Sequence, residues 1–259
     1  MGSNVLFDRK DGIAVLSFNR PDKLNAFNRE MTLELQKALD ACATDPEIRC
    51  ICITGNGKAF SAGQDLMEVT GTNAPSFDQI LADHYNPIVT RIRRIQKPVV
   101  AAVNGVAAGA AANIALCCDI VVAAHSASFI QAFSKIGLIP DSGGTYFLPR
   151  LIGWQRASAY MMLGDKISAT EAERMGMIYK VFPDEEFSTS SMILAASLAK
   201  MPTMALAFTK EALNESMTNS LEAQLSKENK LQQNAAKTKD YDEGVKAFLD
   251  KRAPIFKGE

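Results

Sequence analysis

Strand-like and helix-like segments alternate through the first two-thirds of this chain, and a helical tail follows them. The turn-forming residues 8–12 separate two apolar runs, 5–7 and 13–18, as in an antiparallel hairpin. Further buried strands are predicted at 50–54, 98–103, 120–123 and 128–130, and helices at 28–44, 76–96 and 109–117. Almost all of 186–252 has a helical pattern. The chain is therefore predicted to be an α/β protein with a core over residues 1–200 and a helical region over residues 201–259.

Polar residues mark several of the expected helix starts. Asn28 is placed to cap the first helix, and residues 76–79, 168–171 and 240–243 have the spacing of a capping box. The helix that follows Ser76 is expected to end before Lys97, because the residue preceding a proline disfavours helical geometry.

The composition argues against several classes of function. The chain has 259 residues, of which 47% are hydrophobic and 22% charged, which is enough for one α/β core. A formal net charge of -1 gives no overall attraction to nucleic acid or to an anionic membrane, so an anionic ligand would be held by local Lys or Arg side chains. We expect neither a nucleic-acid partner nor a membrane partner.

Cysteine and histidine usage indicates a reduced compartment and no metal. The 5 cysteines lie in apolar runs, and the 2 histidines form no Cys/His cluster with metal-ligand spacing. Residues 1–6 match neither a signal peptide nor a myristoylation signal, and no apolar run reaches the roughly 20 residues needed to span a bilayer. The expected location is the cytoplasm.

Three segments carry residues suited to catalysis. Residues 59–66 and 104–113 are rich in small residues that leave backbone N–H groups accessible, and residues 139–145 offer the carboxylate of Asp141 in a glycine-flanked turn. Ala110 falls in the first turn of a predicted helix, where N–H groups lack helical partners and the dipole favours negative charge. Two sets of donors and one base suggest chemistry through an enolate.

These segments, together with residues 20–26 (Arg-Pro-Asp-Lys-Leu-Asn-Ala) and 251–256 (Lys-Arg-Ala-Pro-Ile-Phe), resemble the crotonase superfamily, also called enoyl-CoA hydratase/isomerase. The motifs occur in the family's order and cover essentially the whole chain. The resemblance implies a crotonase-type spiral of ββα units with a C-terminal helical trimerisation region. It also implies a homotrimer, or a hexamer built as a dimer of trimers. Such proteins act on acyl-CoA thioesters, so coenzyme A would be part of the substrate, and no further cofactor is expected.

The resemblance also assigns roles within the site. It places the backbone N–H groups of Ala62 and Ala110 in an oxyanion hole around the thioester oxygen. The family's hydratases carry two glutamates that hold and activate water, and the matching positions here are Asn113 and Phe133. An amide and a phenyl ring cannot act as general bases. These two residues are therefore predicted to line the substrate pocket, and a hydratase is disfavoured.

Asp141 stands where the family's isomerases carry an acidic residue, and it is the predicted catalytic base. The alternative is that Asp141 only caps the helix expected to start near Gly144, which would lower its pKa. Desolvation by apolar residues of the segment 133–139 would instead raise the pKa toward neutrality.

Further residues are predicted to contact the substrate. Gln64 is expected in the substrate pocket, and segments 64–76 and 83–92 are expected to wall the acyl group. The resemblance carries CoA binding to the following positions: Lys23, Lys58, Ala59, Asp65 and Leu66. Each lysine could equally be a solvated surface residue, and Asp65 is better suited to fixing its loop through backbone N–H groups.

The helical tail carries more large apolar residues than a small free-standing bundle would bury, so it is expected to cover a neighbouring subunit. These residues are Leu206, Phe208, Leu213, Leu221, Leu225, Leu231 and Phe248.

The predicted activity is a shift of a double bond from the 3-enoyl to the 2-enoyl position, or the rearrangement of a ring epoxide of phenylacetyl-CoA to an oxepin. Segment 129–145 looks most like the phenylacetate-degradation branch of the family. Two alternatives stay open. One is a hydratase in which Asp141 works with a water held by Asn113, and the other is a catalytically silent subunit that binds acyl-CoA or a partner enzyme.

Overall fold

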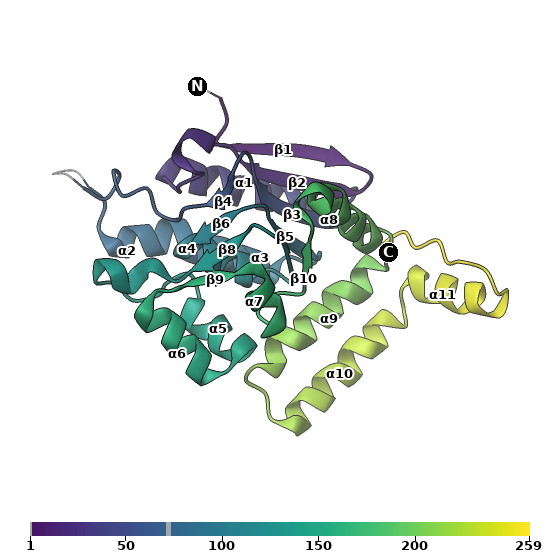
Figure 1. Ribbon diagram of the computed structural model, residues 1–259. Coiled ribbons are helices and arrows are strands. Elements are labelled where there is room, and N and C mark those ends of the chain that lie inside the picture. Colours follow the sequence, from purple (N-terminus) through teal and green to yellow (C-terminus); the bar gives the residue numbers. More distant parts are fainter. Residues whose placement is uncertain (1, 71–73) are drawn as a thin grey trace.

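Two sheets form the centre of the computed structural model, which describes residues 2–70 and 74–259 (Figure 1). The strands are β1 (Val5–Lys10), β2 (Ile13–Phe18), β3 (Cys50–Gly55), β4 (Ala59–Ser61), β5 (Val99–Val103), β6 (Val106–Ala108), β7 (Ile120–Ala124), β8 (Ser128–Ile130), β9 (Lys166–Ser168) and β10 (Lys180–Phe182). The first sheet has the order β1-β2-β3-β5-β7-β10, and only its β1–β2 pair is antiparallel. The second has the order β4-β6-β8-β9, and only its β8–β9 pair is antiparallel.

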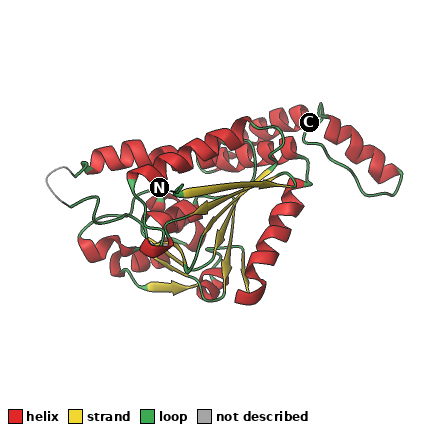
Figure 2. Ribbon diagram, turned by 90° about the horizontal axis from the view of Figure 1, so that it is seen from above, coloured by secondary structure: helices red, strands yellow, loops and turns green. Residues whose placement is uncertain are grey.

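Helices surround these sheets (Figure 2). They are α1 (Arg29–Thr44), α2 (Phe77–Gln79), α3 (Asn86–Arg94), α4 (Ala110–Leu116), α5 (Gly144–Ile152), α6 (Trp154–Leu163), α7 (Ala169–Arg174), α8 (Asp184–Ala199), α9 (Thr203–Ser216), α10 (Leu221–Ala235) and α11 (Lys239–Leu249). A π-helical segment, Ile80–Tyr85, joins α2 to α3, and short 3-10 turns occupy Pro21–Lys23 and Ala132–Ile136.

The chain repeats one unit three times along these sheets. A strand of the first sheet (β3, β5 or β7) is followed by a short strand of the second (β4, β6 or β8) and then by helical residues. Strand β5 is buried at all five positions, as expected for a parallel strand covered on both faces. The predicted spiral of ββα units is therefore confirmed.

Most expected helix starts are confirmed by their hydrogen bonds. The Asn28 side chain accepts from the backbone N–H of Met31, and Ser76 and Gln79 form the complete capping box. At Ser168 the box is only half made, because its hydroxyl accepts from the Glu171 N–H while the Glu171 carboxylate pairs with Arg174.

The capping box predicted at 240–243 is wrong. Thr238 caps α11 instead, and its hydroxyl accepts from the backbone N–H of Tyr241. The buried Asp240 carboxylate accepts from the N–H groups of Lys257 and Gly258, at 2.7 and 2.8 Å. Asp240 therefore holds the C-terminal segment against α11, a contact that local spacing does not show.

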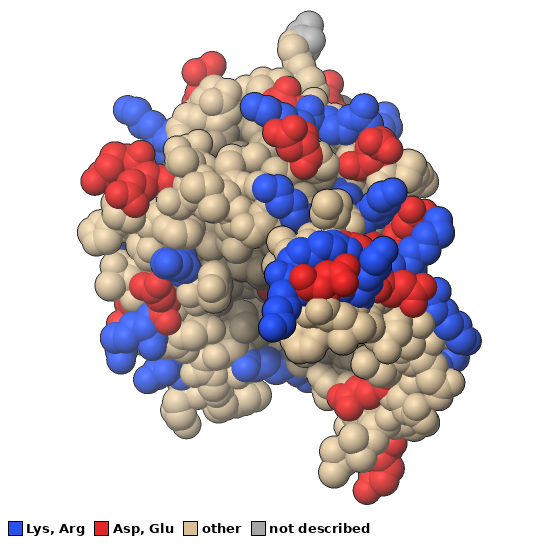
Figure 3. Space-filling view, turned by 90° about the vertical axis from the view of Figure 1, so that its right-hand side faces the viewer, with Lys and Arg blue, Asp and Glu red and all other residues tan. Residues whose placement is uncertain are grey.

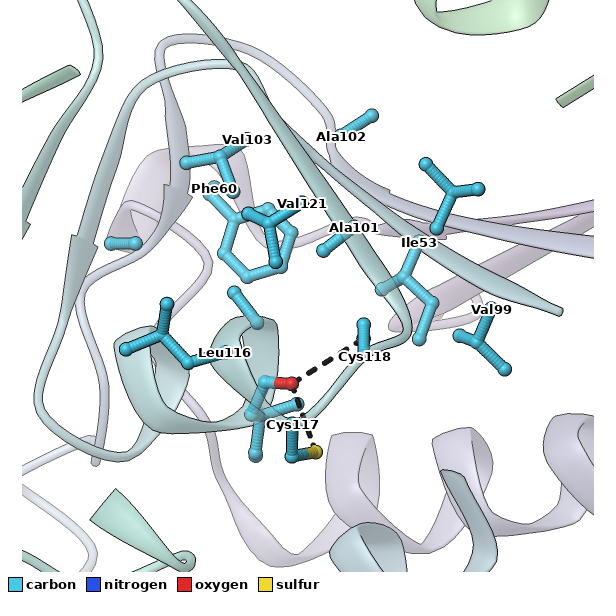
Figure 4. Packing of buried hydrophobic residues seen from close by; sticks show 14 of the residues in the cluster. Ile53, Phe60, Val99, Ala101, Ala102, Val103, Leu116, Cys117, Cys118 and Val121 are labelled. Carbon is cyan, nitrogen blue, oxygen red and sulfur yellow. Dashed lines mark hydrogen bonds between the residues drawn. The ribbon is translucent and has the colours of Figure 1, made fainter. Parts of the chain in front are cut away.

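The core between the sheets and α4 fixes the start of that helix. Phe60 of β4 is fully buried, and Figure 4 shows its ring among Val103, Val121 and Leu116. All seven residues of α4 are buried, so this alanine-rich helix is packed on every side. The first N–H groups of α4 are consequently held in one place relative to the sheets.

The cysteines are part of this core. All 5 are buried and unpaired, and burial raises the pKa of Cys42 to about 11 and that of Cys52 to about 12. Thiols with such pKa values carry almost no thiolate at neutral pH, and they behave as packing residues.

The C-terminal helices attach to the sheets through a largely buried charge cluster. The Lys210 ammonium of α9 lies 2.7 Å from Asp119 Oδ2, and Arg93 of α3 lies 3.0 Å from Asp119 Oδ1. The backbone N–H of Val99 also donates to this carboxylate, at 2.8 Å. Asp119 thus joins α9, α3 and the start of β5.

We expect the substitution Lys210→Met to lower the free energy of unfolding by about 2–4 kcal/mol, because it removes one partner from a largely buried carboxylate. The measurement is urea denaturation followed by circular dichroism. The matched control is Lys227→Met, which removes the exposed bridges to Glu211 and Glu215 and should cost less than about 1 kcal/mol. Equal losses for the two variants would contradict the assignment.

Helix α11 projects from the body of the molecule at the end of the chain (Figure 1). On the face that carries the C-terminal helices, basic and acidic side chains are intermingled (Figure 3). This face therefore shows no large patch of one charge sign, in keeping with the net charge of -1. Within the described residues no single helix is long and apolar enough to cross a membrane. Helices α8 and α9 reach that length and composition only as a pair, bent by 100° where they meet.

Candidate active site

Two backbone N–H groups lie unpartnered in the loops that follow the adjacent strands β4 and β6. No atom of the described residues accepts a hydrogen bond from the N–H of Gln64 or of Ala110, the first residue of α4. Gly63 lets the loops meet: a Cβ there would lie 2.7 Å from the Ala108 oxygen and 3.8 Å from the Ala110 nitrogen. The peptide after Gly63, which carries the Gln64 N–H, therefore lies beside Ala110.

The prediction that the Ala62 N–H is an oxyanion-hole donor is wrong. That N–H donates to the carbonyl oxygen of Leu24 at 2.9 Å, so it is not available to a ligand. The N–H of Gln64 takes the place of the Ala62 N–H. Phe27 forms an isolated parallel bridge with Gln64, in which the Phe27 N–H donates to the Gly63 oxygen and the Asp65 N–H donates to the Phe27 oxygen. In such a bridge the N–H of the residue between points away from the partner strand. The partner of this bridge lies far from Gln64 in the sequence, so local pattern does not reveal it.

Asp141 occupies a tight turn in front of α5. Ser142 and Gly143 both adopt left-handed backbone conformations, with φ of 51° and 77°. The Ser142 hydroxyl donates to Asp141 Oδ1 at 2.8 Å. Helix α5 begins after Gly143 with no side-chain cap, so the alternative that Asp141 merely caps this helix is not observed.

Burial raises the pKa of Asp141 to about 6, and the Ser142 hydroxyl opposes this rise in part. The predicted direction of the shift is confirmed. The source of the desolvation differs from expectation in part, since Ile136 and Ile139 are 55% and 81% exposed. At neutral pH this carboxyl is mostly ionised yet can hold a proton during turnover, which suits a general base.

Asn113 does not line a pocket as predicted. Its side chain is fully buried, its Nδ2 donates to the backbone oxygen of Asp141 at 2.9 Å, and its Oδ1 accepts from Gln131 at 2.7 Å. The physical reason is that the second turn of α4 faces the Asp141 loop, not open space. Phe133 is also buried, and its ring would be 3.8 Å from a Cβ at Gly109, so it forms an apolar wall beside the Ala110 donor.

Tyr85, at the end of the π-helical segment, was not singled out by the sequence. Its hydroxyl donates to Gln64 Oε1 at 2.5 Å, and Gln64 Nε2 donates to Glu68 at 3.1 Å. Burial raises the pKa of Tyr85 well above its ordinary value, and the Asp141 carboxylate contributes to this rise. Tyr85 thus lies within electrostatic reach of Asp141, and the Gln64 side chain that it contacts is tied to protein partners. Residues 71–73 of the predicted wall lie outside the described residues.

The predicted CoA-binding residues separate into two groups. Lys23, Lys58 and Leu66 are exposed, and a Cβ at Gly57 would lie 3.1 Å from Pro21, so the two lysine-bearing loops are adjacent. They form a surface to which phosphates could bind.

Ala59 and Asp65 make structural contacts, and their assignment to CoA binding stays a prediction. Ala59 is buried, and its carbonyl accepts from Asn25 and Asn104 at 2.8 and 3.3 Å. Asp65 accepts from Arg20 at 2.9 Å and from the Met67 N–H at 3.2 Å, so it fixes its own loop, as its position in the turn suggested. In residues 2–70 and 74–259, no group of three or more His, Cys, Asp or Glu side chains is arranged to hold a metal ion.

A carboxyl with a raised pKa beside two free backbone donors, on a spiral of ββα units, defines a crotonase-type site. The model of the enoyl-CoA hydratase/isomerase family matches residues 8–259, and the chain belongs to this family. It is 46% identical to the 1,2-epoxyphenylacetyl-CoA isomerase of Escherichia coli strain K12, with 98% of each chain covered. It is 43% identical to a probable enoyl-CoA hydratase of Rhodobacter capsulatus, again with 98% of each covered. The enoyl-CoA hydratase structure from Bacillus anthracis superposes with a TM-score of 0.92 at 33% identity and covers 99% of this chain and 100% of its own.

Proposed function

We propose that this enzyme is an acyl-CoA isomerase that uses Asp141 as its single base. The observation that carries the proposal is the Asp141 carboxyl, with its pKa raised to about 6, held against α4 one helical turn from the unpartnered Ala110 N–H. The positions of the hydratase glutamates hold Asn113 and Phe133, which supports one base over two.

The reaction follows from these groups. The Asp141 carboxylate removes a proton from C2 of a 3-enoyl-CoA, and the bonding pair moves toward the thioester carbonyl. The resulting enolate oxygen accepts hydrogen bonds from the Gln64 and Ala110 N–H groups. When the carbonyl re-forms, the double bond moves from C3–C4 to C2–C3, and C4 takes the proton back from Asp141. A ring epoxide of phenylacetyl-CoA, rearranged to an oxepin, is the second substrate we propose, because the relative that is 46% identical is named for that compound.

Deuterated water provides the test. We expect 3-hexenoyl-CoA to be converted to 2-hexenoyl-CoA, with part of the hydrogen removed from C2 recovered at C4, because one carboxyl carries it. Mass spectrometry reports the position of the label, and absorbance reports conjugation. Absence of conjugation with this substrate and absence of turnover of the epoxide would together reject the proposal.

A hydratase is the second candidate, since one of the relatives above is a probable enoyl-CoA hydratase. In this case Asp141 would activate a water that adds to C3 of a 2-enoyl-CoA. Crotonyl-CoA distinguishes the two: rapid formation of 3-hydroxybutyryl-CoA would favour the hydratase over the isomerase.

The pH dependence of isomerisation should show one acid limb. Asp141 must be ionised to accept a proton, so kcat/KM is expected to be constant above its pKa of about 6 and to fall about tenfold per pH unit below it. Initial rates with 3-hexenoyl-CoA between pH 4.5 and 8.5 measure this limb. A limb near pH 4 would show that the base is a well-solvated carboxyl and not Asp141.

We also propose that the chain assembles as a homotrimer or hexamer through its C-terminal helices. The apolar residues of the tail differ in burial. Leu231 is buried and Leu206 and Phe208 are half-buried, whereas Leu213, Leu221, Leu225 and Phe248 are 59%, 69%, 55% and 83% exposed. Large apolar side chains exposed together commonly mark a subunit interface. Light scattering should give three or six times the chain mass of 28.1 kDa, and Phe248→Asp should reduce it. A monomeric wild type would contradict this proposal.

A further inference from the structure

Two buried amide side chains hold the loop that carries Asp141. Asn113 and Gln131 are 0% and 1% exposed and come from α4 and from the end of β8. Gln131 Nε2 donates to Asn113 Oδ1 at 2.7 Å, and Asn113 Nδ2 donates to the Asp141 backbone oxygen at 2.9 Å. The backbone N–H of Gly144 donates to the same oxygen at 2.8 Å. The chain of contacts ends at a backbone atom of Asp141, so it acts on the loop and does not touch the reacting carboxylate.

The contact between α4 and this loop is close. A Cβ at Gly144 would lie 2.3 Å from Asn113 Nδ2, so any other residue at 144 would push the loop away from the amide. The left-handed Ser142 and Gly143 lie between Asp141 and Gly144, the two residues joined by the backbone hydrogen bond of this turn. A non-glycine residue such as Ser142 is strained in that conformation, and surrounding contacts must offset the strain.

The orientation of both amides follows from the Asp141 backbone oxygen, at which this series of hydrogen bonds ends. A backbone carbonyl only accepts, so Asn113 must present its NH₂ group to Asp141 and its oxygen to Gln131. Gln131 must then present its own NH₂ group. The consequence is that Gln131 Oε1 is buried without a hydrogen-bond partner among the described residues, a property that it shares there with Ser191 Oγ alone.

We infer that Asn113 and Gln131 are positioning residues for Asp141, and that position 113 must carry a hydrogen-bond donor to keep the base in its catalytic place. An unpartnered buried carbonyl is unfavourable for folding. The unpartnered carbonyl of Gln131 is explained if its oriented amide holds Asn113, and through Asn113 the Asp141 loop, in position. This inference rests on the proposed isomerase function and names the residues that hold its base.

Two substitutions test the inference on the intact enzyme. Gln131→Met keeps a side chain of similar length but removes the donor to Asn113, so it exchanges one unpartnered oxygen for another. We expect kcat for 3-hexenoyl-CoA to fall about tenfold or more, because small displacements of a catalytic group are costly. The denaturation midpoint should change little. Ser191→Ala, which removes the other unpartnered oxygen, far along the chain in α8, is the matched control and should leave kcat unchanged.

A second variant, Asn113→Asp, tests the inference through the ionisation of Asp141. It replaces the donor with a carboxylate, which repels the Asp141 oxygen and disfavours ionisation of the Asp141 carboxylate. Asp141 is packed against Asn113 of α4 and its own Ser142, and Tyr85 senses its charge; no charged side chain is among the causes of its pKa shift. The acid limb of the pH profile should therefore move to higher pH in this variant, a change that simple loss of folded protein would not produce.

The outcomes separate the inference from the function it rests on. If Asp141→Asn abolishes isomerisation while Gln131→Met and Asn113→Asp leave kcat and the acid limb unchanged, the positioning role is wrong and the isomerase stands. If Asp141→Asn retains full isomerisation, the proposed function fails first. Should Asn113→Asp not fold, the kcat of Gln131→Met relative to Ser191→Ala still decides.

Discussion

Replacing Asp141 with asparagine is expected to lower kcat for isomerisation by about 10²–10⁴-fold, the usual contribution of a general base. Asparagine keeps the size of the side chain and can still accept the hydrogen bond from Ser142. It cannot take up a proton from C2. The measurement is the initial rate with 3-hexenoyl-CoA, together with binding of the substrate by calorimetry, which should persist because Asp141 contributes no group to CoA binding.

The same variant should be more stable than the wild type at neutral pH. The pKa of Asp141 is raised in the folded state from 3.8 to about 6, so the folded state binds the proton more tightly than the unfolded state does. This favourable contribution is complete below pH 4 and is lost as the pH rises through 6. Two pKa units represent about 3 kcal/mol, and partial solvent screening of this half-buried group reduces the effect to about 1–2 kcal/mol.

This pH dependence separates a catalytic role from a structural one. Denaturation of both proteins at pH 4 and pH 7.5 should show similar stabilities at the lower pH and a more stable variant at the higher. A variant that is less stable at both pH values and retains its kcat would instead indicate a helix cap. A variant that keeps both its stability and its full turnover would mean that the base lies elsewhere.

Ala110→Pro is expected to lower kcat by about 10²–10³-fold, because it deletes one of the two N–H groups assigned to the enolate oxygen. Ala110 is the first residue of α4, where proline is tolerated since its missing N–H has no helical partner. Gly109 precedes it with φ of 55° and ψ of -129°, and its lack of a Cβ eases the restriction that proline imposes. The helix should therefore form, and the loss should fall on turnover.

A matched substitution isolates the effect of the lost donor. Lys239→Pro also places proline at the first residue of a helix, α11, after a capping residue in extended conformation. Its exposed ion pair with Glu259 contributes little. We expect kcat to be unchanged in this control, with near-wild-type circular dichroism for both variants. Full activity in a folded Ala110→Pro protein would remove Ala110 from the oxyanion hole.

The fold class and the family could be predicted from the sequence, and Asp141 was proposed from it as the base. Short continuous apolar runs predicted most strands of the first sheet, because strands buried on both faces are hydrophobic at nearly every position. The three-residue strands β4, β6, β9 and β10 were not predicted, although β8, of the same length, was, because so few residues give little periodicity to recognise. Asp141 was found because a carboxylate in a glycine-flanked turn is a local pattern, and the direction of its pKa shift followed from expected burial.

The groups that surround Asp141 were not predictable, because contacts from distant parts of the chain set them. The first oxyanion donor is assigned to Gln64 and not to Ala62 because Leu24 and Phe27, distant in the sequence, take up the neighbouring backbone groups. Asn113 turned inward for the same kind of reason, since its amide meets a loop that begins 28 residues later. Which hydrogen-bonding groups remain free for a ligand depends on partners that the fold brings from elsewhere in the chain, and no local spacing contains that information.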